Sequence, residues 1–503
     1  MFLKKLINNL NKDKKNIKIK GISTNSKEVK KDHMFFAIQG KKINGEKYID
    51  EAIKKGAVVI VCSKKCKYRN SKVTVIKVLN IRYFLSEVSS NFYKLKPKNI
   101  ILVTGTNGKT SVADLFYQIL SLNNIPVASI GTLGIKFKNK IIKTNLTSPD
   151  TISIHKNLKI IKNNKIDNVI IEASSHGLDQ NRLDHLKLKA GIFTNFSQDH
   201  LDYHKSMRLY LNAKLYLFKK ILLKKSNIIS DESIKQFPIL KKISKKRKLH
   251  LINISKIMDR INIIPKLTFN IFQKKNLSMA IAAAKLCGLD DKKIYSSLKE
   301  IKDIDGRLEL VRIFPNNIKI FIDYAHTPDA LSKVLQSLKS TYSQNVTLVF
   351  GCGGDRDYKK RPLMAKVANA SCKKIYVTDD NPRNENPAKI RNEIFKKINF
   401  RKCFNIGDRA KAIKTAVLNA EPNEIILIAG KGHELQQVYK NKILSISDRQ
   451  IIQKLKVKIK ILSKKNYDFL INRKILKKLN KKIMIKNFCG LKIDSREIKK
   501  NNL

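Results

Sequence analysis

Short apolar runs alternate with stretches of helical periodicity along most of this chain. Apolar runs of about four to eight residues are typical of buried strands, whereas apolar residues three and four apart are typical of amphipathic helices. The alternation predicts an α/β fold whose sheets are mostly parallel and carry helices on both faces. The strand-like runs lie at 56–61, 99–103, 125–130, 168–173, 190–196, 227–230, 318–324, 346–351, 374–379 and 424–430.

The length of 503 residues is enough for about three domains of roughly 150 residues each. We predict an N-terminal domain at 1–97, a central domain at 98–305 and a C-terminal domain at 306–455. Residues 456–503 are rich in Lys, Ile and Asn, without a clear alternation of strand and helix. We expect a basic tail there.

Positive charge is spread along the whole chain. There are 104 Lys and Arg against 40 Asp and Glu, a formal net charge of +64. Such an excess is a feature of nucleic-acid-binding proteins, but those cluster their basic residues and interleave them with aromatic ones. Here Lys accompanies abundant Asn and Ile and no Trp, a pattern that favours drift toward A/T-rich codons. We therefore expect no nucleic-acid partner.

Features of membrane and secreted proteins are missing from the sequence. No apolar run approaches the ~18–20 residues that span a bilayer, and the opening MFLKKLINNLNKDKK lacks the apolar core of a signal peptide. Seven scattered Cys are typical of a reducing compartment. Cys62 and Cys66 form half of a zinc pattern without a second half. We expect a cytoplasmic protein without membrane insertion.

A glycine-containing loop joins the run 99–103 to a helical stretch at 112–122. Its sequence, VTGTNGKTS, is a shortened form of the phosphate loop found between a strand and a helix. Backbone N–H groups and a helix N-terminus bind polyphosphate in such loops. Lys109 can reach the terminal phosphates, and the Thr110 hydroxyl can bind Mg²⁺. The alternative is a tight turn followed by an exposed Lys.

Carboxylates and histidines follow two further strand-like runs. Glu172 lies at the end of one run, and DHLDYH, which contains His200 and His204, follows another. Such groups beside a triphosphate suit Mg²⁺ or its water shell. A zinc pair is the alternative, but no His-Glu-x-x-His pattern is present. Lys214 lies in an apolar helical stretch, where a Lys usually extends to solvent; facing a metal, it would have to be modified or deprotonated.

Nine motifs, in chain order, resemble those of the Mur ligases: TGTNGKT, EASSHGLDQNR, FTNFSQDHLDYH, AKLYLF, GRLE, DYAHTPDAL, FGCGGDRD, DNPR and AGKGHE, over about residues 20–450. The resemblance implies an N-terminal UDP-binding domain, a central P-loop ATPase domain and a C-terminal domain with a Rossmann-like sheet. It also implies ATP-dependent amide ligation in peptidoglycan precursor synthesis. There, ATP phosphorylates the D-Glu γ-carboxylate of UDP-MurNAc-L-Ala-D-Glu, and an amino group attacks the acyl phosphate.

The resemblance further implies the residues that serve ATP and Mg²⁺. Thr110 and Glu172 would hold one ion, and His200 and Lys214 the second, with Lys214 as an N6-carboxylysine whose carbamate is an anionic ligand. The implied catalytic residues are Lys109, Lys214, His200 and His326. The implied ATP-binding residues are Gly105, Thr106, Asn107, Gly108, Lys109, Thr110, Ser111, Asn276, Arg307 and Asp323. Domain closure over ATP would bring the C-terminal ones into place.

Two substrate sites follow from the same resemblance. The DNPR motif looks like the version that selects meso-diaminopimelate, whose distal carboxylate Arg383 can pair with bidentately. The family's usual motifs differ from this chain at 25–27 and 40–43, so we assign no contacts at 41–43. The residues implied for the UDP-muramoyl dipeptide are Thr24, Ser26, Thr147, Ser148, Ser174, Gln180 and Arg182. Those implied for diaminopimelate are Arg356, Asp380, Asn381, Pro382, Arg383, Gly430 and Glu434.

Three alternatives compete with this hypothesis. Folylpolyglutamate synthetase shares the phosphate loop and the metal-site logic, but DNPR, DHLDYH and DYAHTPD argue against it. A basic nucleic-acid-binding P-loop ATPase lacks support from basic clusters interleaved with aromatics. An inactive remnant is disfavoured by the intact Lys109, Glu172, His200 and Lys214. We expect a monomer whose partners are UDP-MurNAc-L-Ala-D-Glu and meso-diaminopimelate.

The end of the tail resembles the start of another Mur ligase. Residues 490–503, GLKIDSREIKKNNL, match 21–34, GISTNSKEVKKDHM, in Gly, Ser, Glu and two Lys. We hypothesise that the chain ends inside the first residues of a second ligase of the same family. Deletion of 456–503 should then leave activity intact.

Overall fold

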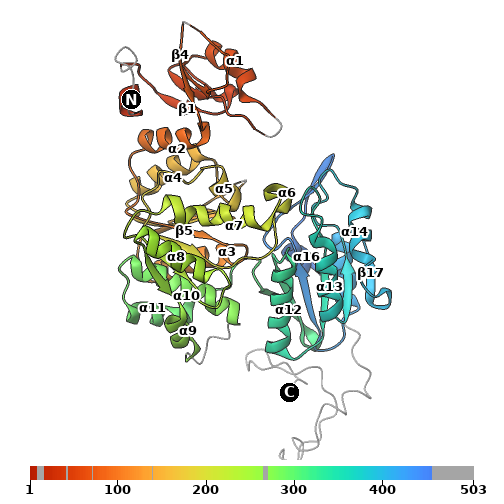
Figure 1. The fold of residues 1–503 in the computed structure, drawn as a ribbon. Helices are drawn as coiled ribbons and strands as arrows, with labels where there is room; N and C mark the ends of the chain where they lie inside the picture. The colour runs from red at the N-terminus through yellow and green to blue at the C-terminus, as the bar shows by residue number, and fades with distance from the viewer. Residues whose placement is uncertain are drawn as a thin grey trace, which may run out of the picture. The chain divides into compact units, whose positions relative to one another are not determined.

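The computed structural model describes residues 1–7, 16–40, 43–70, 72–138, 140–144, 146–263 and 270–455. Within these residues lie three mainly parallel sheets and a two-stranded hairpin, with helices packed on the sheets (Figure 1). The α/β class predicted from the alternating runs is confirmed. Our expectations for 456–503 fall outside the described residues.

The N-terminal sheet is parallel throughout, in the order β1-β2-β3-β4. Its side chains alternate between two cores because successive residues of a strand face opposite sides. In β3, Val59 and Val61 pack with Leu85 of α2, whereas Ile60 packs with Ile49 of α1. The elements are β1 (Gly21–Ser23), β2 (His33–Phe36), α1 (Ile49–Lys54), β3 (Ala57–Ser63), β4 (Thr74–Val78) and α2 (Ile81–Phe92).

The central sheet has the order β12-β11-β10-β5-β9-β6-β7-β8 and is parallel from β12 to β6, with β7 and β8 antiparallel. Helices α3, α9, α10 and α11 cover one face, and α4, α5, α7 and α8 the other. Its strands are β5 (Asn99–Thr104), β6 (Val127–Gly131), β7 (Gly134–Phe137), β8 (Lys140–Ile142), β9 (Asn168–Glu172), β10 (Ala190–Phe193), β11 (Asn227–Ser230) and β12 (His250–Asn253). Its helices are α3 (Lys109–Leu122), α4 (Thr151–Asn163), α5 (Ser175–Asp179), α6 (Leu201–His204), α7 (Met207–Tyr216), α8 (Phe237–Arg247), α9 (Ser255–Asn262), α10 (Ile271–Leu286) and α11 (Asp291–Ser297).

The C-terminal sheet has the order β13-β14-β18-β15-β16-β17, and only β13 runs antiparallel to its neighbour. Helices α12, α13 and α14 pack into one core of this sheet. The strands are β13 (Glu309–Phe314), β14 (Ile318–Asp323), β15 (Val346–Phe350), β16 (Lys374–Val377), β17 (Cys403–Asn405), β18 (Ile425–Ala429) and the hairpin β19 (Gln436–Tyr439) and β20 (Lys442–Ser445). The helices are α12 (Pro328–Tyr342), α13 (Lys360–Ser371), α14 (Pro387–Phe395), α15 (Arg409–Leu418) and α16 (Asp448–Lys454).

A buried ion pair joins α15 to α16. Arg409 donates through Nε and Nη2 to the two oxygens of Asp448, each at 2.7 Å. Both side chains are about fully buried, at 1% exposure each. Such a forked pair satisfies two charges that the interior would otherwise disfavour.

The predicted strands agree with the structure in place and differ at their ends. The run 227–230 coincides with β11, whereas β10 ends at Phe193, short of the predicted residue 196. Thr194 and Asn195 leave the strand because both donate to the carbonyl of Asn107 in the neighbouring loop. The domain boundaries near residues 97 and 305 stay predictions.

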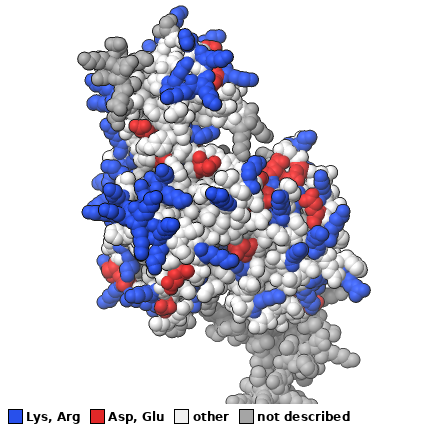
Figure 2. All heavy atoms as spheres, in the orientation of Figure 1, with Lys and Arg blue, Asp and Glu red and all other residues white. Residues whose placement is uncertain are grey.

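On the face shown in Figure 2, Lys and Arg cover more of the surface than Asp and Glu do, and they are densest near α8. Among the described residues, no helix combines the length and the apolar character needed to cross a bilayer. The exposed lysines of α8 and of the turn η5 (Leu217–Ile221) are Lys219, Lys220, Lys241, Lys242, Lys245 and Lys246.

Candidate active site

The loop between β5 and α3 forms the centre of the candidate active site. Gly105 and Gly108 have φ angles of 148° and 86°. A Cβ at Gly105 would collide with the Thr194 hydroxyl, and one at Gly108 would lie 2.6 Å from Oδ1 of Asn276. Both positions therefore need glycine for backbone freedom and for space. The first N–H groups of α3 have no partner within the helix, a setting that binds phosphate.

Two lysines meet at one oxygen of this loop. The Gly105 carbonyl accepts from Nζ of Lys109 at 2.9 Å and from Nζ of Lys214 at 2.7 Å. Lys214 is 1% exposed, and its amine lies 4.5 Å from the centre of the Tyr210 ring. Burial, together with the charge of Lys109, holds the pKa of Lys214 well below its usual range. Lys214 thus does not extend to solvent, and its surroundings disfavour the charged form of its amine.

Glu172, at the end of β9, is buried and accepts three hydrogen bonds. The donors are the Thr110 hydroxyl at 3.0 Å, the Thr132 N–H at 2.8 Å and the Thr132 hydroxyl at 3.1 Å. Nη2 of Arg307 donates to the Thr110 hydroxyl at 2.9 Å. Carboxylate and hydroxyl oxygens thus lie beside the first turn of α3. Hard divalent cations prefer such oxygen ligands. Since no three His, Cys, Asp or Glu cluster around a metal position in the described residues, a cation here would also need phosphate oxygens or a modified lysine.

Asp199 gathers three ionisable side chains. Its carboxylate lies 3.3 Å from Nε2 of His200, 3.6 Å from Nε2 of His326 and 3.6 Å from Nζ of Lys360. Burial raises the pKa of Asp199, but Lys360 and the two histidines outweigh this and hold it well below its usual range. Burial lowers the pKa of His200 to about 3, so its imidazole is neutral at physiological pH.

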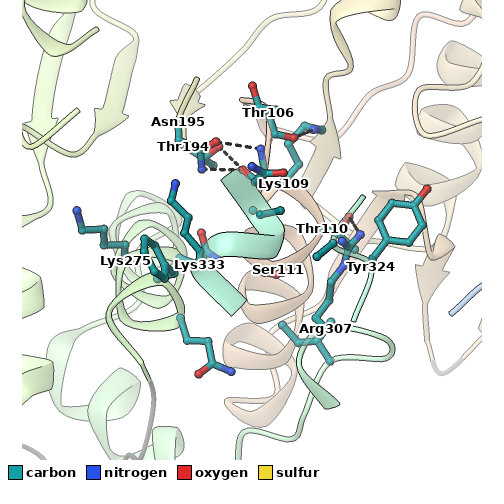
Figure 3. A pocket seen from close by; sticks show the side chains of 18 of the residues that line it. Thr106, Lys109, Thr110, Ser111, Thr194, Asn195, Lys275, Arg307, Tyr324 and Lys333 are labelled. Carbon is teal, nitrogen blue, oxygen red and sulfur yellow. Dashed lines mark hydrogen bonds between the residues drawn. The ribbon is translucent and has the colours of Figure 1, made fainter. Parts of the chain in front are cut away.

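A cavity of about 320 Å³ opens beside the loop. Phe272 and Asn276 from α10 line it together with Lys333 from α12. The Lys333 amine lies 5.0 Å from the centre of the Phe272 ring. Figure 3 shows Lys333 on one side of the pocket and Arg307 with Tyr324 on the other. Asn276 therefore lies on the cavity wall beside the phosphate loop.

Arg307 and Asp323 approach this cavity from the C-terminal part of the chain. The guanidinium of Arg307 lies 4.5 Å from the centre of the Tyr324 ring. Asp323 accepts two backbone N–H groups at 2.6 Å each, and burial raises its pKa. Nδ1 of His326 lies 2.8 Å from the carbonyl oxygen of Tyr324. These contacts bring the Arg307, Asp323 and His326 expected from the sequence to one side of the phosphate loop.

Five residues expected at the dipeptide site form one hydrogen-bonded group. The hydroxyls of Ser148 and Ser174 lie 2.9 Å apart. Arg182 donates to the Ser148 carbonyl and to Oε1 of Gln180, each at 2.7 Å. The Thr147 hydroxyl lies 3.2 Å from that of Thr132, which also contacts Glu172. The group is thus continuous with the carboxylate beside the phosphate loop.

Thr24 and Ser26 lie apart from that group in the hydrogen-bond network. They follow β1 in the N-terminal domain, where the Ser26 hydroxyl donates to Oε2 of Glu51 at 2.8 Å. Among the described residues, no hydrogen bond links either of them to Ser148 or Arg182. The structure therefore brings together five of the seven expected residues.

The residues expected to bind the amino acid surround the carboxyl ends of β15, β16 and β18. Nη1 of Arg383 donates to the carbonyl of Gly354 at 2.8 Å and to that of Asn381 at 3.3 Å. Burial and the neighbouring Arg356 lower the pKa of Arg383. The Asn381 side chain donates to Oε2 of Glu434 at 2.8 Å. Arg383 and Glu434, which carry opposite charges, thus both contact Asn381.

Gly430 completes this region. Its φ angle is 109°, and a Cβ there would lie 2.8 Å from Oδ2 of Asp380. Pro382 lies between Asn381 and Arg383, and Arg383 itself has a positive φ of 53°. The DNPR turn therefore ends in a left-handed backbone conformation at Arg383.

Several site residues were not assigned from the sequence. Asp199 belongs to the DHLDYH motif, so its place next to His200 was the feature of the sequence that could have identified it. Lys431 is fully buried and donates to Oε2 of Glu434 at 3.0 Å. It belongs to the AGKGHE motif, but the sequence alone assigns it no role. Thr132, Lys333 and Lys360 reach the site only through the fold, because each lies far along the chain from its contacts.

The fold and the site define a phosphate-loop α/β protein whose nucleotide-type cavity is completed by a C-terminal domain. The chain belongs to the Mur ligase family. Three family models match it: "Mur ligase family, catalytic domain" at 18–93, "Mur ligase middle domain" at 103–283 and "Mur ligase, glutamate ligase domain" at 306–432.

Several sequence relatives share one name. A UDP-N-acetylmuramoyl-L-alanyl-D-glutamate–2,6-diaminopimelate ligase of Rickettsia montanensis is 39% identical, covering 87% of this chain and 96% of its own. The ligase of the same name from Brucella melitensis is 36% identical, with 86% and 93% covered. A solved structure of a ligase with this name superposes with a TM-score of 0.62 and 25% identity, over 90% of this chain and 98% of that one.

A folylpolyglutamate synthase of Mycobacterium tuberculosis shares the fold as well. It superposes with a TM-score of 0.55, covering 69% of this chain and 91% of its own. Its identity of 15% shows a common fold and nothing finer. The alternative considered from the sequence therefore shares the architecture, while the sequence relatives carry the diaminopimelate ligase name.

Proposed function

We propose that this chain is an ATP-dependent ligase that joins meso-2,6-diaminopimelate to the D-Glu γ-carboxylate of UDP-MurNAc-L-Ala-D-Glu. The observation that carries the proposal is the convergence of Lys109, Glu172 and Lys214 with Arg307 and His326 on one cavity. A phosphoryl-transfer site completed by a second domain suits activation of a carboxylate and its capture by an amine. The name shared by the sequence relatives supports this substrate pair.

ATP suits the loop because its glycines allow the tight turn that leads into the N-terminus of α3, where backbone N–H groups can bind phosphate. Lys109 would exchange its bonds to the loop carbonyls for bonds to the terminal phosphates, and Asn276 would face the adenine side. Bound Mg²⁺ would neutralise phosphate charge during the transfer. Thr110 and Glu172 would hold one ion. His200, with its neutral imidazole, and Lys214 would hold a second.

Lys214 suits the role of an N6-carboxylysine. A neutral amine can attack carbon dioxide, forming an N–C bond and releasing one proton, whereas an ammonium has no lone pair. The depressed pKa of Lys214 favours the neutral form. The carbamate would give the metal site the anionic oxygen ligand that the unmodified chain lacks at this position.

The other residue groups suit the two substrates. Arg182 and Gln180, with Thr147, Ser148 and Ser174, provide donors for the oxygens of the UDP-muramoyl dipeptide, and Thr24 and Ser26 would contact its uridine end. Arg383 and Arg356 suit the distal carboxylate of diaminopimelate, and Glu434 with Asn381 suits its amino group. Asp380, Pro382 and Gly430 would shape that pocket.

The chemistry then proceeds in two steps. The γ-carboxylate oxygen of D-Glu attacks the terminal phosphorus of ATP, and the bond to the departing ADP oxygen breaks. Lys109 and Arg307 stabilise the charge that develops there. The amine of diaminopimelate next attacks the acyl carbon, loses a proton and displaces phosphate, which leaves with the bonding electron pair. Asp323 and His326 would hold the nucleotide from the C-terminal side.

Product formation tests the proposal. The protein is incubated with ATP, Mg²⁺, UDP-MurNAc-L-Ala-D-Glu and either meso-diaminopimelate or L-lysine, and the muramoyl product is identified by mass. We expect an adduct with diaminopimelate only. An adduct with L-lysine only would keep the ligase and refute the selection by Arg383. An adduct with neither amino acid would refute the proposed function.

The assembly and location of the protein stay predictions. We expect a monomer in light scattering and a cytoplasmic location, where ATP and nucleotide sugars are made. No shift of a labelled nucleic acid is expected at physiological salt, although the basic surface near α8 should produce weak binding at low salt.

A further inference from the structure

The segment after β15, residues 351–361, links the proposed diaminopimelate pocket to Asp199. At one end, the Gly354 carbonyl accepts from Nη1 of Arg383 at 2.8 Å. At the other end, Nζ of Lys360 lies 3.6 Å from Asp199, and Oδ2 of Asp357 accepts from the Gln198 amide at 3.3 Å. One short segment therefore contacts both the amino-acid side and the phosphoryl-transfer side of the site.

Arg361 makes this segment stiff. Its side chain is 1% exposed and donates to the Gly353 carbonyl at 3.3 Å, to both oxygens of Glu385 at 2.9 Å and to Glu393 at 2.9 Å. The N–H of Gly354 also donates to the Asn381 carbonyl at 2.9 Å. A buried guanidinium whose Nη1 and Nη2 bond to two carboxylates and a carbonyl resists separation of these groups. The segment and the turn carrying Arg383 should therefore move together.

Lys360 forms the ion pair between the segment 351–361 and the central domain. It is 5% exposed, and Asp199 is 4% exposed, so each charge depends on the other for compensation. Asp199 in turn contacts His200 and His326. The neighbouring Lys359 is exposed. Lys360, at the start of α13, is thus buried, whereas Lys359, its N-cap, is exposed, although both carry the same side chain.

We propose that Lys360 is a positioning residue that couples amino-acid binding at Arg383 to nucleotide binding beside Asp199. The inference rests on the proposed function. Diaminopimelate would steady the turn of Arg383, the stiff segment 351–361 would transmit this to Lys360, and Lys360 would hold Asp199 with its histidines in the closed arrangement. Linkage then requires each ligand to raise the affinity for the other by the same factor.

The test measures the affinity for a non-hydrolysable ATP analogue with Mg²⁺ and UDP-MurNAc-L-Ala-D-Glu, with and without diaminopimelate. In the wild-type protein we expect diaminopimelate to strengthen analogue binding by about fivefold or more. Lys360→Met should abolish this enhancement, and Lys360→Arg should retain most of it. Lys359→Met, which removes the same charge one residue away, should behave as wild type. Gln198→Ala, which leaves the ion pair intact, should weaken the enhancement and serves if Lys360→Met does not fold.

Each outcome either supports or overturns the coupling through Lys360. An unchanged enhancement in Lys360→Met, or an equal loss in Lys359→Met, overturns the coupling. So does a wild-type protein that forms the diaminopimelate product but shows no enhancement, and in that case the proposed function stands. A wild-type protein that neither forms this product nor binds diaminopimelate removes the proposed function and the coupling together.

Discussion

Lys214 and Lys109 donate to the same backbone oxygen, the carbonyl of Gly105, from 2.7 and 2.9 Å. Two ammonium groups that share one acceptor in a buried place repel each other, and within the described part of the chain neither pairs with a carboxylate that would offset this. The structure relieves the conflict by favouring the neutral form of Lys214. A lysine in that state is reactive toward carbon dioxide, which leads to the first prediction.

Lys214→Ala should lower diaminopimelate-dependent phosphate release by about 10²- to 10³-fold, the loss typical when one group that stabilises a transition state electrostatically is removed. Carbon NMR with isotope-labelled bicarbonate should show a carbamate in the wild-type protein and none in the variant. Lys219→Met, an exposed change near the same helix, is the control. Full activity of the wild-type protein in carbon-dioxide-free buffer would contradict the prediction.

Gly108→Ala should raise KM for ATP at least tenfold. The left-handed backbone costs roughly 1–2 kcal/mol with a side chain, and the added Cβ would press on Asn276 at 2.6 Å. Gly288→Ala is a matched control, because Gly288 has a φ of 91° but nothing within 4 Å of its Cβ position. That control should lose a similar amount of stability in thermal unfolding and keep its KM for ATP. Equal effects of both changes on KM would refute the contact argument.

Arg383→Lys should raise KM for diaminopimelate by about ten- to a hundredfold, since hydrogen bonds to a charged group contribute about 1.5–3 kcal/mol and lysine cannot form the fork. KM for ATP should stay unchanged in the same steady-state measurements. Arg401→Lys, at an exposed position of the same domain, should alter neither value. Retained diaminopimelate affinity in Arg383→Lys would place the selecting group elsewhere.

Stability should fall in acid partly through His433. Burial, followed by the charge of Arg307, lowers the pKa of His433 to about 4, from an ordinary value of 6.5. As pH falls from 6.5 to about 4, the unfolded chain gains a proton at this residue before the folded one does, so stability decreases across that window. The loss from His433 is at most about 3 kcal/mol.

His433→Asn should therefore show a smaller decrease in the free energy of unfolding between neutral pH and pH near 4. Urea unfolding at several pH values measures this difference. His250→Asn, at an exposed histidine, should follow the wild-type curve. Parallel curves for wild type and His433→Asn would show that His433 titrates normally in the folded protein.

Asp448→Asn should destabilise the protein by about 3–5 kcal/mol, because it leaves the charge of Arg409 buried and unmatched. Asp305→Asn removes a partner of Arg449 at 2.8 Å, but that carboxylate side chain is 63% exposed. Its loss should cost no more than about 1 kcal/mol. Chemical unfolding of both variants tests the contrast, and equal losses would contradict it.

The sequence predicted the α/β class and ten of the twenty strands in the described residues, because strands buried on both faces are continuous apolar runs. The run 227–230 coincides with β11. The predicted strand ends were less accurate where a tertiary contact ends the strand. At Thr194, just after β10, the hydroxyl donates to the Asn107 carbonyl. No local pattern carries such information.

The parts of the candidate site that lie within one contiguous motif were predictable from the sequence. The loop around Lys109 is of this kind, since strand, glycines and helix are contiguous. Lys360 is not, because its contact with Asp199 joins residues from two domains. The depressed pKa of Lys214 likewise arises from burial that only the folded chain provides. A single sequence does not reveal which residues far apart along the chain lie close together in the fold.

The Arg409–Asp448 pair also bears on how such a sequence can evolve. A chain drifting toward lysine codons can exchange exposed arginines at little cost, because water compensates the difference. At Arg409 the exchange would replace two parallel bonds to Asp448 with one and leave an oxygen unsatisfied in the interior. Arg361 and Arg409, the buried arginines of the described residues, should therefore be the last that such drift exchanges for lysine.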